Sequence, residues 1–169
     1  MDLTLKVISE SGITKAIAKA ERYRCLNEPE EAESICRDIL AADPGNTMGA
    51  RILGLALTDQ FTGDAGDRYD EVEEIFRQLA DPYERLYYTG ILYERRLKAQ
   101  LSAGRPAHTL LPLLEEALRC FADAEKIRPT GNDDSILRWN RCVRLFQSRS
   151  DFEWQAELVS FDAHDSPPY

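Results

Sequence analysis

Residues 29–57 read PEEAESICRDILAADPGNTMGARILGLAL and contain two helix-length segments separated by a turn. In the first segment, small and apolar residues return at steps of three or four positions, as on one face of a helix: Ala32, Ile35, Cys36, Ile39 and Leu40. A turn follows at residues 43–46 (Asp-Pro-Gly-Asn), after which Thr47 is expected to cap a second helix. That helix has the same spacing in Ile52, Leu53, Ala56 and Leu57. We therefore predict a pair of antiparallel helices.

The same succession of helix-length segments and breakers continues on both sides of this pair. Leucine (20 residues) and alanine (18) far outnumber isoleucine (10) and valine (4), which favours helices over strands. A first helix is expected over residues 14–26, and residues 62–67 form a loop before a fourth helix. Further helices are expected over residues 82–102, 109–127 and 134–149.

The expected helices carry an internal repeat. In the second helix of each pair, small or apolar residues occupy positions i, i+4 and i+7: Ala32, Cys36 and Ile39; Val72, Phe76 and Leu79; Ala117, Phe121 and Ala124. The first helices have a matching pattern in Ala20 with Tyr23, Leu53-Gly54 with Leu57, and Gly90 with Tyr93. A proline closes each unit, at Pro44, Pro82 and Pro129. Small residues allow paired helices to approach closely, while the larger side chains fill the space between them.

This pattern resembles the tetratricopeptide repeat (TPR), in which Leu-Gly, Tyr, Ala, Phe and Pro recur about every 34 residues. The resemblance covers residues 13–129 and implies an all-α, right-handed α-solenoid of about three antiparallel helix pairs, with repeats at 13–46, 47–82 and 83–131. A terminal helix at 134–149 would complete a domain of residues 1–149, followed by a tail at 150–169. The spacings from Ala32 to Val72 and from Val72 to Ala117 imply insertions in the second and third repeats.

Composition restricts the classes of partner. The 169 residues are 43% apolar and 30% charged, as in a soluble globular domain with a hydrophobic core. The net charge of −9 opposes binding to a polyanion, so no nucleic acid is expected. No run reaches the roughly 20 apolar residues of a membrane span, and the N-terminal residues lack the layout of a signal peptide. We therefore expect a cytoplasmic protein with no membrane partner.

Recognisable catalytic and metal-binding motifs are missing from the sequence. The four cysteines are widely spaced and form no CxxC pair: Cys25, Cys36, Cys120 and Cys142. We expect them to be reduced and mostly buried as small apolar residues, with no metal, disulfide or cofactor. Neither His108 nor His164 lies beside a nucleophile in a known motif. The chain is expected to be non-enzymatic. The alternative is an enzyme whose site lies between the third hairpin and the tail and includes both histidines.

The resemblance also implies a binding surface, because the first helix of each TPR pair lines a concave groove. The groove positions expected here are Ile17, Glu21, Arg51, Leu55, Tyr87, Tyr88, Ile91 and Arg95, followed on the last helix by Asn140 and Arg144. This mixture of aromatic, aliphatic and arginine side chains suits an amphipathic peptide or helix. Relatives that bind a terminal carboxylate have Lys, Asn and Arg there, whereas this chain has Ile17, Glu21 and Leu55 at several positions. Tyr87 and Tyr88 suit the core of a long hairpin equally well.

The last expected helix is rich in arginine. Arg138, Arg141 and Arg149 lie on one side of it, opposite the apolar Ile136, Val143 and Phe146. Such a stripe is either a solvated helix face or a dock for acidic segments.

From the resemblance to the tetratricopeptide repeat, we expect an adaptor that binds a protein or peptide, as a monomer or a weak homodimer. The chain also resembles the TPR chaperones of secreted proteins in length and acidity, which leaves that function as an alternative.

The tail is too apolar to be fully solvated, because it contains Phe152, Trp154, Leu158, Val159 and Phe161. Trp154, Leu158 and Phe161 fit one face of a helix, although the same segment also alternates like a strand. The tail is expected to pack on the stack through residue 161, where it either caps the last helix or occupies the groove.

Overall fold

In a computed structural model, which describes residues 3–149 and 151–155, the chain is all-helical. The helices are α1 (Ile13–Cys25), α2 (Pro29–Ala42), α3 (Thr47–Asp59), α4 (Tyr69–Arg77), α5 (Pro82–Ser102), α6 (Leu111–Lys126), α7 (Asp134–Gln147) and the short α8 (Asp151–Trp154). Two 3₁₀ turns precede α1 and α6, at Glu10–Gly12 and Ala107–Leu110. No strand occurs among the described residues.

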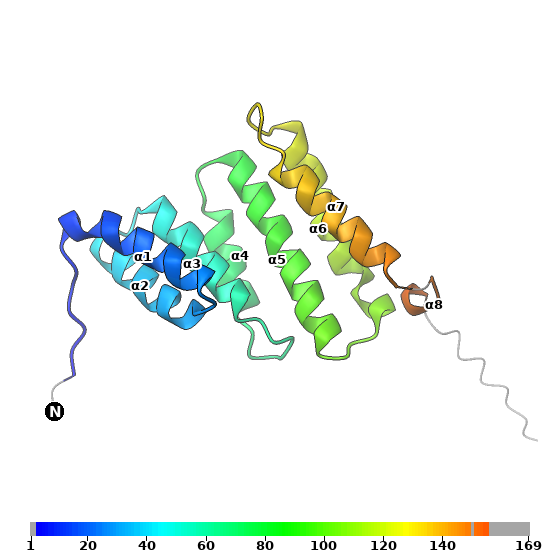
Figure 1. The fold of residues 1–169 in the computed structure, drawn as a ribbon, viewed down its shortest axis with the longest axis horizontal. Helices are drawn as coiled ribbons and strands as arrows, with labels where there is room; N and C mark the ends of the chain where they lie inside the picture. The colour runs from blue at the N-terminus through cyan, green and yellow to red at the C-terminus, as the bar shows by residue number, and fades with distance from the viewer. Residues whose placement is uncertain (1–2, 150, 156–169) are drawn as a thin grey trace, which may run out of the picture.

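The helices pack in chain order, from α1 at one end of the molecule to α7 and α8 at the other (Figure 1). Each of α1 to α6 contacts the helix that follows it, and α1, α3, α5 and α7 also contact one another in turn. The surface formed by these four helices is called the odd-helix face below. It consists of the first helix of each expected pair and the expected terminal helix.

Local sequence signals account for the starts of α2, α3 and α5. Pro29 and Pro82 lie in the first turns of α2 and α5, where a missing N–H is harmless. The Asp81 carboxylate caps α5 by accepting from the backbone N–H groups of Tyr83 (2.7 Å) and Glu84 (3.1 Å). The cap of α3 is Asn46, whose side chain accepts from the Gly49 N–H at 2.8 Å. The expectation for Thr47 is therefore wrong by one residue.

Two further helix ends differ from the prediction. The segment around Thr109 forms a 3₁₀ turn, and α6 begins at Leu111. The Thr109 hydroxyl donates to the carbonyl of Pro106 at 2.7 Å, which holds this tighter turn ahead of the helix. At the other end of the chain, α7 stops at Gln147 rather than Arg149.

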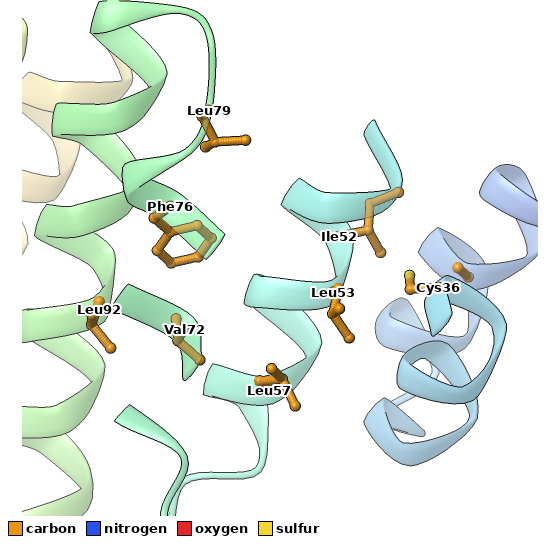
Figure 2. Packing of buried hydrophobic residues seen from close by; sticks show 9 residues of the cluster. Cys36, Ile52, Leu53, Leu57, Val72, Phe76, Leu79 and Leu92 are labelled. Atoms are coloured by element: carbon orange, nitrogen blue, oxygen red, sulfur yellow. The ribbon is translucent and has the colours of Figure 1, made fainter. Parts of the chain in front are cut away.

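The residues of the repeat pattern form the core. All nine positions expected on the second helices are buried, although Leu79 lies two residues beyond the end of α4. None of them is more than 2% exposed: Ala32, Cys36, Ile39, Val72, Phe76, Leu79, Ala117, Phe121 and Ala124. Figure 2 shows one cluster between α2 and α5, in which Cys36, Leu53 and Phe76 point into the space between the helices. A second cluster lies between α5, α6 and α7. Leu55 and Tyr88 pack against both clusters and so join them.

Two glycines allow the closest contacts within helix pairs. A Cβ atom on Gly54 of α3 would lie 2.3 Å from the Phe76 ring of α4. A Cβ atom on Gly90 of α5 would lie 2.6 Å from the Phe121 ring of α6. The glycine and the phenylalanine occupy the same pattern positions in both pairs, so these pairs share one packing arrangement.

Gly54→Ala is expected to lower the free energy of unfolding by about 1–3 kcal/mol, because the new methyl group overlaps a buried ring. Urea denaturation measures this loss. Adding Phe76→Leu removes the overlapping ring edge, so the double variant should lose less than the sum of the two single losses. Gly66→Ala is the matched control, because its Cβ would meet no atom within 4 Å. A Gly54→Ala variant as stable as wild type would contradict the close approach.

A cluster of charged residues joins α2 to the loop before α4. Glu33 accepts two hydrogen bonds from the guanidinium of Arg68, both at 2.6 Å, and others from Arg37 and Gln60, both at 2.9 Å. The bonds from Arg68 hold the pKa of Glu33 well below its usual range, at about 2. Burial opposes this shift, while Gln60 and Arg37 add to it.

This cluster predicts a pH-dependent part of the stability. A carboxylate whose pKa is lowered by folding stabilises the fold fully at pH values above its pKa in the unfolded chain, near 4.5. This stabilisation is lost as the pH falls from 4.5 towards the folded-state pKa of about 2. Glu33→Gln should cost about 1 kcal/mol at neutral pH, because solvent screens a pairing with the partly exposed Arg68 and Arg37, and the difference from wild type should shrink over that window. Denaturation at several pH values measures it. Glu30→Gln, at an exposed position on the same helix, serves as the control. A pH-independent difference would contradict the assignment.

Candidate functional site

The structure distributes the expected groove residues between surface and core. Glu21 and Arg144 are exposed, whereas Ile17 and Asn140 are half-buried. Arg51 is engaged with α5, because its guanidinium pairs with Glu84 at 2.6 Å. Position on a first helix therefore does not by itself leave a side chain available to a partner.

Tyr87 and Tyr88 belong to a chain of aromatic rings across α4, α5 and α6. Tyr87 lies 5.7 Å from Tyr83, 5.1 Å from Tyr88 and 6.1 Å from Phe121, between ring centroids. Tyr88 also contacts Phe76 at 5.5 Å, and burial raises the pKa of its hydroxyl. Both tyrosines remain half-buried, so each combines a role in the core with an accessible edge.

The expectation that Ile91 faces a groove is wrong. Its side chain is only 2% exposed and belongs to the second core cluster. Both α6 and α7 pack against α5, and Ile91 lies in the cluster between these helices.

The expected arginine stripe is divided among three environments. Arg138 turns towards α5 and pairs with Glu94 at 3.3 Å. Arg149 pairs with Glu153 at 3.0 Å, while Arg141 is exposed. Arg138 turns inwards because it lies on the buried side of α7. Ser135 and Cys142, three residues before it and four after it, share this side and are both fully buried.

The odd-helix face contains an open hollow of about 500 Å³ where α3, α5 and α7 meet. Its lining residues are Thr58, Asp59, Phe61, Thr62, Arg95, Lys98, Ala99, Ser102 and Arg138. The hollow thus brings together Arg95, expected in the groove, and Arg138, expected in a separate acidic dock.

Asp59 and Arg95 form one side of this hollow. Arg95 donates to the carbonyl of Leu55 at 3.1 Å and also contacts Thr58 and Asp59. Arg24 of α1 pairs with the same Asp59 at 2.7 Å. One carboxylate therefore serves two guanidinium groups, and burial lowers the pKa of Arg95.

Lys98 and Arg138 form the other side of the hollow, and both pair with Glu94, which is fully buried beneath them. Lys98 lies one turn after Glu94 on α5, whereas Arg138 belongs to α7. Burial alone would lower the pKa of Arg138, but Glu94 and the Tyr87 hydroxyl raise it overall. The lining of the hollow contains three cationic side chains, Arg95, Lys98 and Arg138, and one carboxylate, Asp59, which is a local excess of positive charge in a chain of net charge −9.

Sequence reasoning missed Asp59, Glu94 and Lys98. A signal for Glu94 was present, because it lies three residues after Ile91 and three before Leu97 and so shares their side of the helix. A carboxylate in such a position requires a cationic partner. No comparable signal identifies Asp59, whose partners come from α1 and α5.

Several other expectations concern residues outside this hollow. Cys36, Cys120 and Cys142 are buried, and Cys25 is exposed. His108 is half-buried in the 3₁₀ turn before α6, whereas His164, Leu158, Val159 and Phe161 lie outside the described residues. Within residues 3–149 and 151–155, no three His, Cys, Asp or Glu side chains are grouped to hold a metal ion. None of the described helices has the length and apolar character needed to cross a membrane.

In comparisons with known proteins, no family model, no curated protein and no solved structure matches this chain.

Proposed function

We propose that this chain is a tetratricopeptide-like solenoid that binds an acidic, amphipathic protein segment on its odd-helix face. The observation that carries the proposal is the hollow between α3, α5 and α7, with its excess of positive charge. On the surface of an acidic protein, few sites attract the carboxylates of a partner. The hollow is such a site.

The solenoid assignment is supported by packing that repeats from pair to pair. Gly54 meets Phe76 in the second pair, and Gly90 meets Phe121 in the third. The odd-numbered helices contact one another in sequence, as the first helices of stacked repeats do.

The apolar part of the proposed ligand is matched by residues next to the hollow. Arg95 donates to the backbone carbonyl of Leu55, and Tyr87 lies near enough to Arg138 to raise the pKa of that guanidinium. The half-buried side chains next to the charged lining of the hollow therefore extend the proposed binding surface with apolar groups: Leu55, Tyr87 and Tyr88. A segment with acidic and apolar residues on one face would meet complementary groups along this surface.

The binding test uses a fluorescein-labelled peptide with Glu and Leu at helical spacing, and a second peptide with Gln in place of Glu. Fluorescence anisotropy is expected to show tighter binding of the Glu peptide, weakening as salt is added. Ser102→Glu places a negative charge in the hollow without removing an ion pair, so it should weaken binding at least about tenfold, or about 1.4 kcal/mol.

Two matched variants separate charge from size and from net charge. Ser102→Gln adds the same bulk without charge and should bind nearly as wild type. Ser34→Glu adds the same charge on α2, away from the odd-helix face, and should also be neutral. Equal binding of the two peptides, or equal effects of all three variants, would overturn the proposed function.

A further inference from the structure

Exposed apolar side chains are concentrated at the α1 end of the stack. Leu3, Leu5 and Val7 lie in the non-helical segment before the first 3₁₀ turn, and each is between 76% and 95% exposed. This segment leaves the stack at the start of α1 (Figure 1). Leu26, at the C-terminal cap of α1, is 58% exposed. Single exposed apolar residues are common on protein surfaces, but such a concentration indicates a contact surface.

The same end of the molecule carries unpaired positive charge. Lys15, Lys19 and Arg22 lie on one side of α1, opposite the buried Ala20. All three are exposed, and none of them forms an ion pair with another residue of the described chain. Residues 3–26, called the basic end below, contain five lysines or arginines and two glutamates, in a chain of net charge −9.

The exposed side of α1 is open rather than enclosed. A depression of about 590 Å³ follows it, and its described lining comes entirely from α1 and the C-terminal cap: Lys15, Ala18, Lys19, Arg22, Tyr23 and Leu26. A bound helix or strand normally lies in a groove, between two walls. The described chain supplies only one wall here, so a broad and flat partner fits this surface better than a peptide.

We propose that the basic end binds the surface of an anionic lipid bilayer. The cations of α1 lie against the lipid headgroups, and the apolar side chains of residues 3–7 insert between them. Stable surface binding generally requires two such signals together, because a few apolar groups or a few cations alone bind only weakly.

Two earlier arguments against a membrane partner do not apply to this arrangement. The expectation of no membrane partner rested on the lack of a membrane-spanning run, and a chain that lies on a bilayer surface needs none. The net charge of −9 opposes binding only where it is close to the lipid, since salt at 0.1 M screens exposed charges beyond about 10 Å. The charge of the basic end therefore dominates when that end faces the bilayer.

Co-sedimentation with lipid vesicles tests the charge. The full chain should bind vesicles of phosphatidylcholine and phosphatidylglycerol in equal parts, and less so as salt is added, but not vesicles of phosphatidylcholine alone. Lys15→Gln with Arg22→Gln should weaken binding about 25-fold, because each cation near an anionic surface contributes about fivefold. Lys126→Gln with Arg141→Gln removes the same two charges from exposed positions on α6 and α7 and should have little effect.

A second pair of variants tests the inserted residues. Leu5→Ser should weaken vesicle binding about tenfold, because burial of a leucine side chain in an apolar environment is lost. The fold should be unaffected, since Leu5 is 95% exposed. Leu137→Ser, at a 63% exposed position on α7, is the matched control and should bind as wild type.

Other results would overturn the proposal. Failure of the wild-type chain to bind the anionic vesicles, or equal losses in the α1 pair and its control pair, would exclude the basic end as a lipid-binding surface. Wild-type binding by Leu5→Ser would show that residues 3–7 do not insert. If the vesicles are not bound while Lys15→Gln with Arg22→Gln weakens binding of the Glu peptide, the basic end binds an acidic protein segment instead.

Discussion

Replacing Lys98 and Arg138 together by methionine should lower the free energy of unfolding by about 3–5 kcal/mol. The two cations are the ion-pair partners of Glu94, whose carboxylate is fully buried. Without them, the fold must bury an unpaired negative charge, which is costly. Urea denaturation at neutral pH measures the loss.

A third substitution provides the control for that result. Adding Glu94→Met to the double variant replaces the whole ion cluster with apolar groups, which is often close to neutral in stability. The triple variant should therefore recover most of the lost free energy. If the double variant were within about 1 kcal/mol of wild type, Glu94 would not depend on these partners.

Trp154→Ala should cost about 3–5 kcal/mol, because it removes a buried indole that stacks on Phe146. It also removes the hydrogen bond to the Phe146 carbonyl. Thermal or urea denaturation of the full chain measures the effect. Trp154→Phe keeps a ring against Phe146 and loses only the indole N–H, so its cost should be near 1 kcal/mol. A Trp154→Ala variant within about 0.5 kcal/mol of wild type would indicate a surface side chain instead.

The helices could be predicted because their signals are local. Pro29 and Pro82 mark first turns, and the small and aromatic residues of the repeat pattern identify the buried face of each second helix. Burial of these positions depends only on a neighbour helix being present. Errors occurred where two nearby residues could both cap a helix, as with Asn46 and Thr47, or where a 3₁₀ turn competed with the first α-turn.

The charged site could be predicted only in part, because its contacts join distant segments. Arg138 and Glu94 are 44 residues apart, and Arg24 and Asp59 are 35 apart. Helical geometry placed Arg138 on the same side as Arg141, but the packing of α7 against α5 buries that edge of the helix. The rotation of each helix about its own axis therefore decides which arginines remain available to a partner. The spacing of residues along a single helix does not predict this rotation.

The packing of each helix mainly against its neighbours in the chain also determines how the molecule comes apart. In such a row, the end helices are each held from one side, whereas α3, α4 and α5 are held from both. Loss of structure can therefore begin at an end and advance one helix at a time, at the cost of one interface per step. The same geometry makes the molecule elastic along its long axis, since small changes of angle at successive interfaces add up. A ligand spanning α3, α5 and α7 would restrict these changes of angle from the centre of the row to its α7 end.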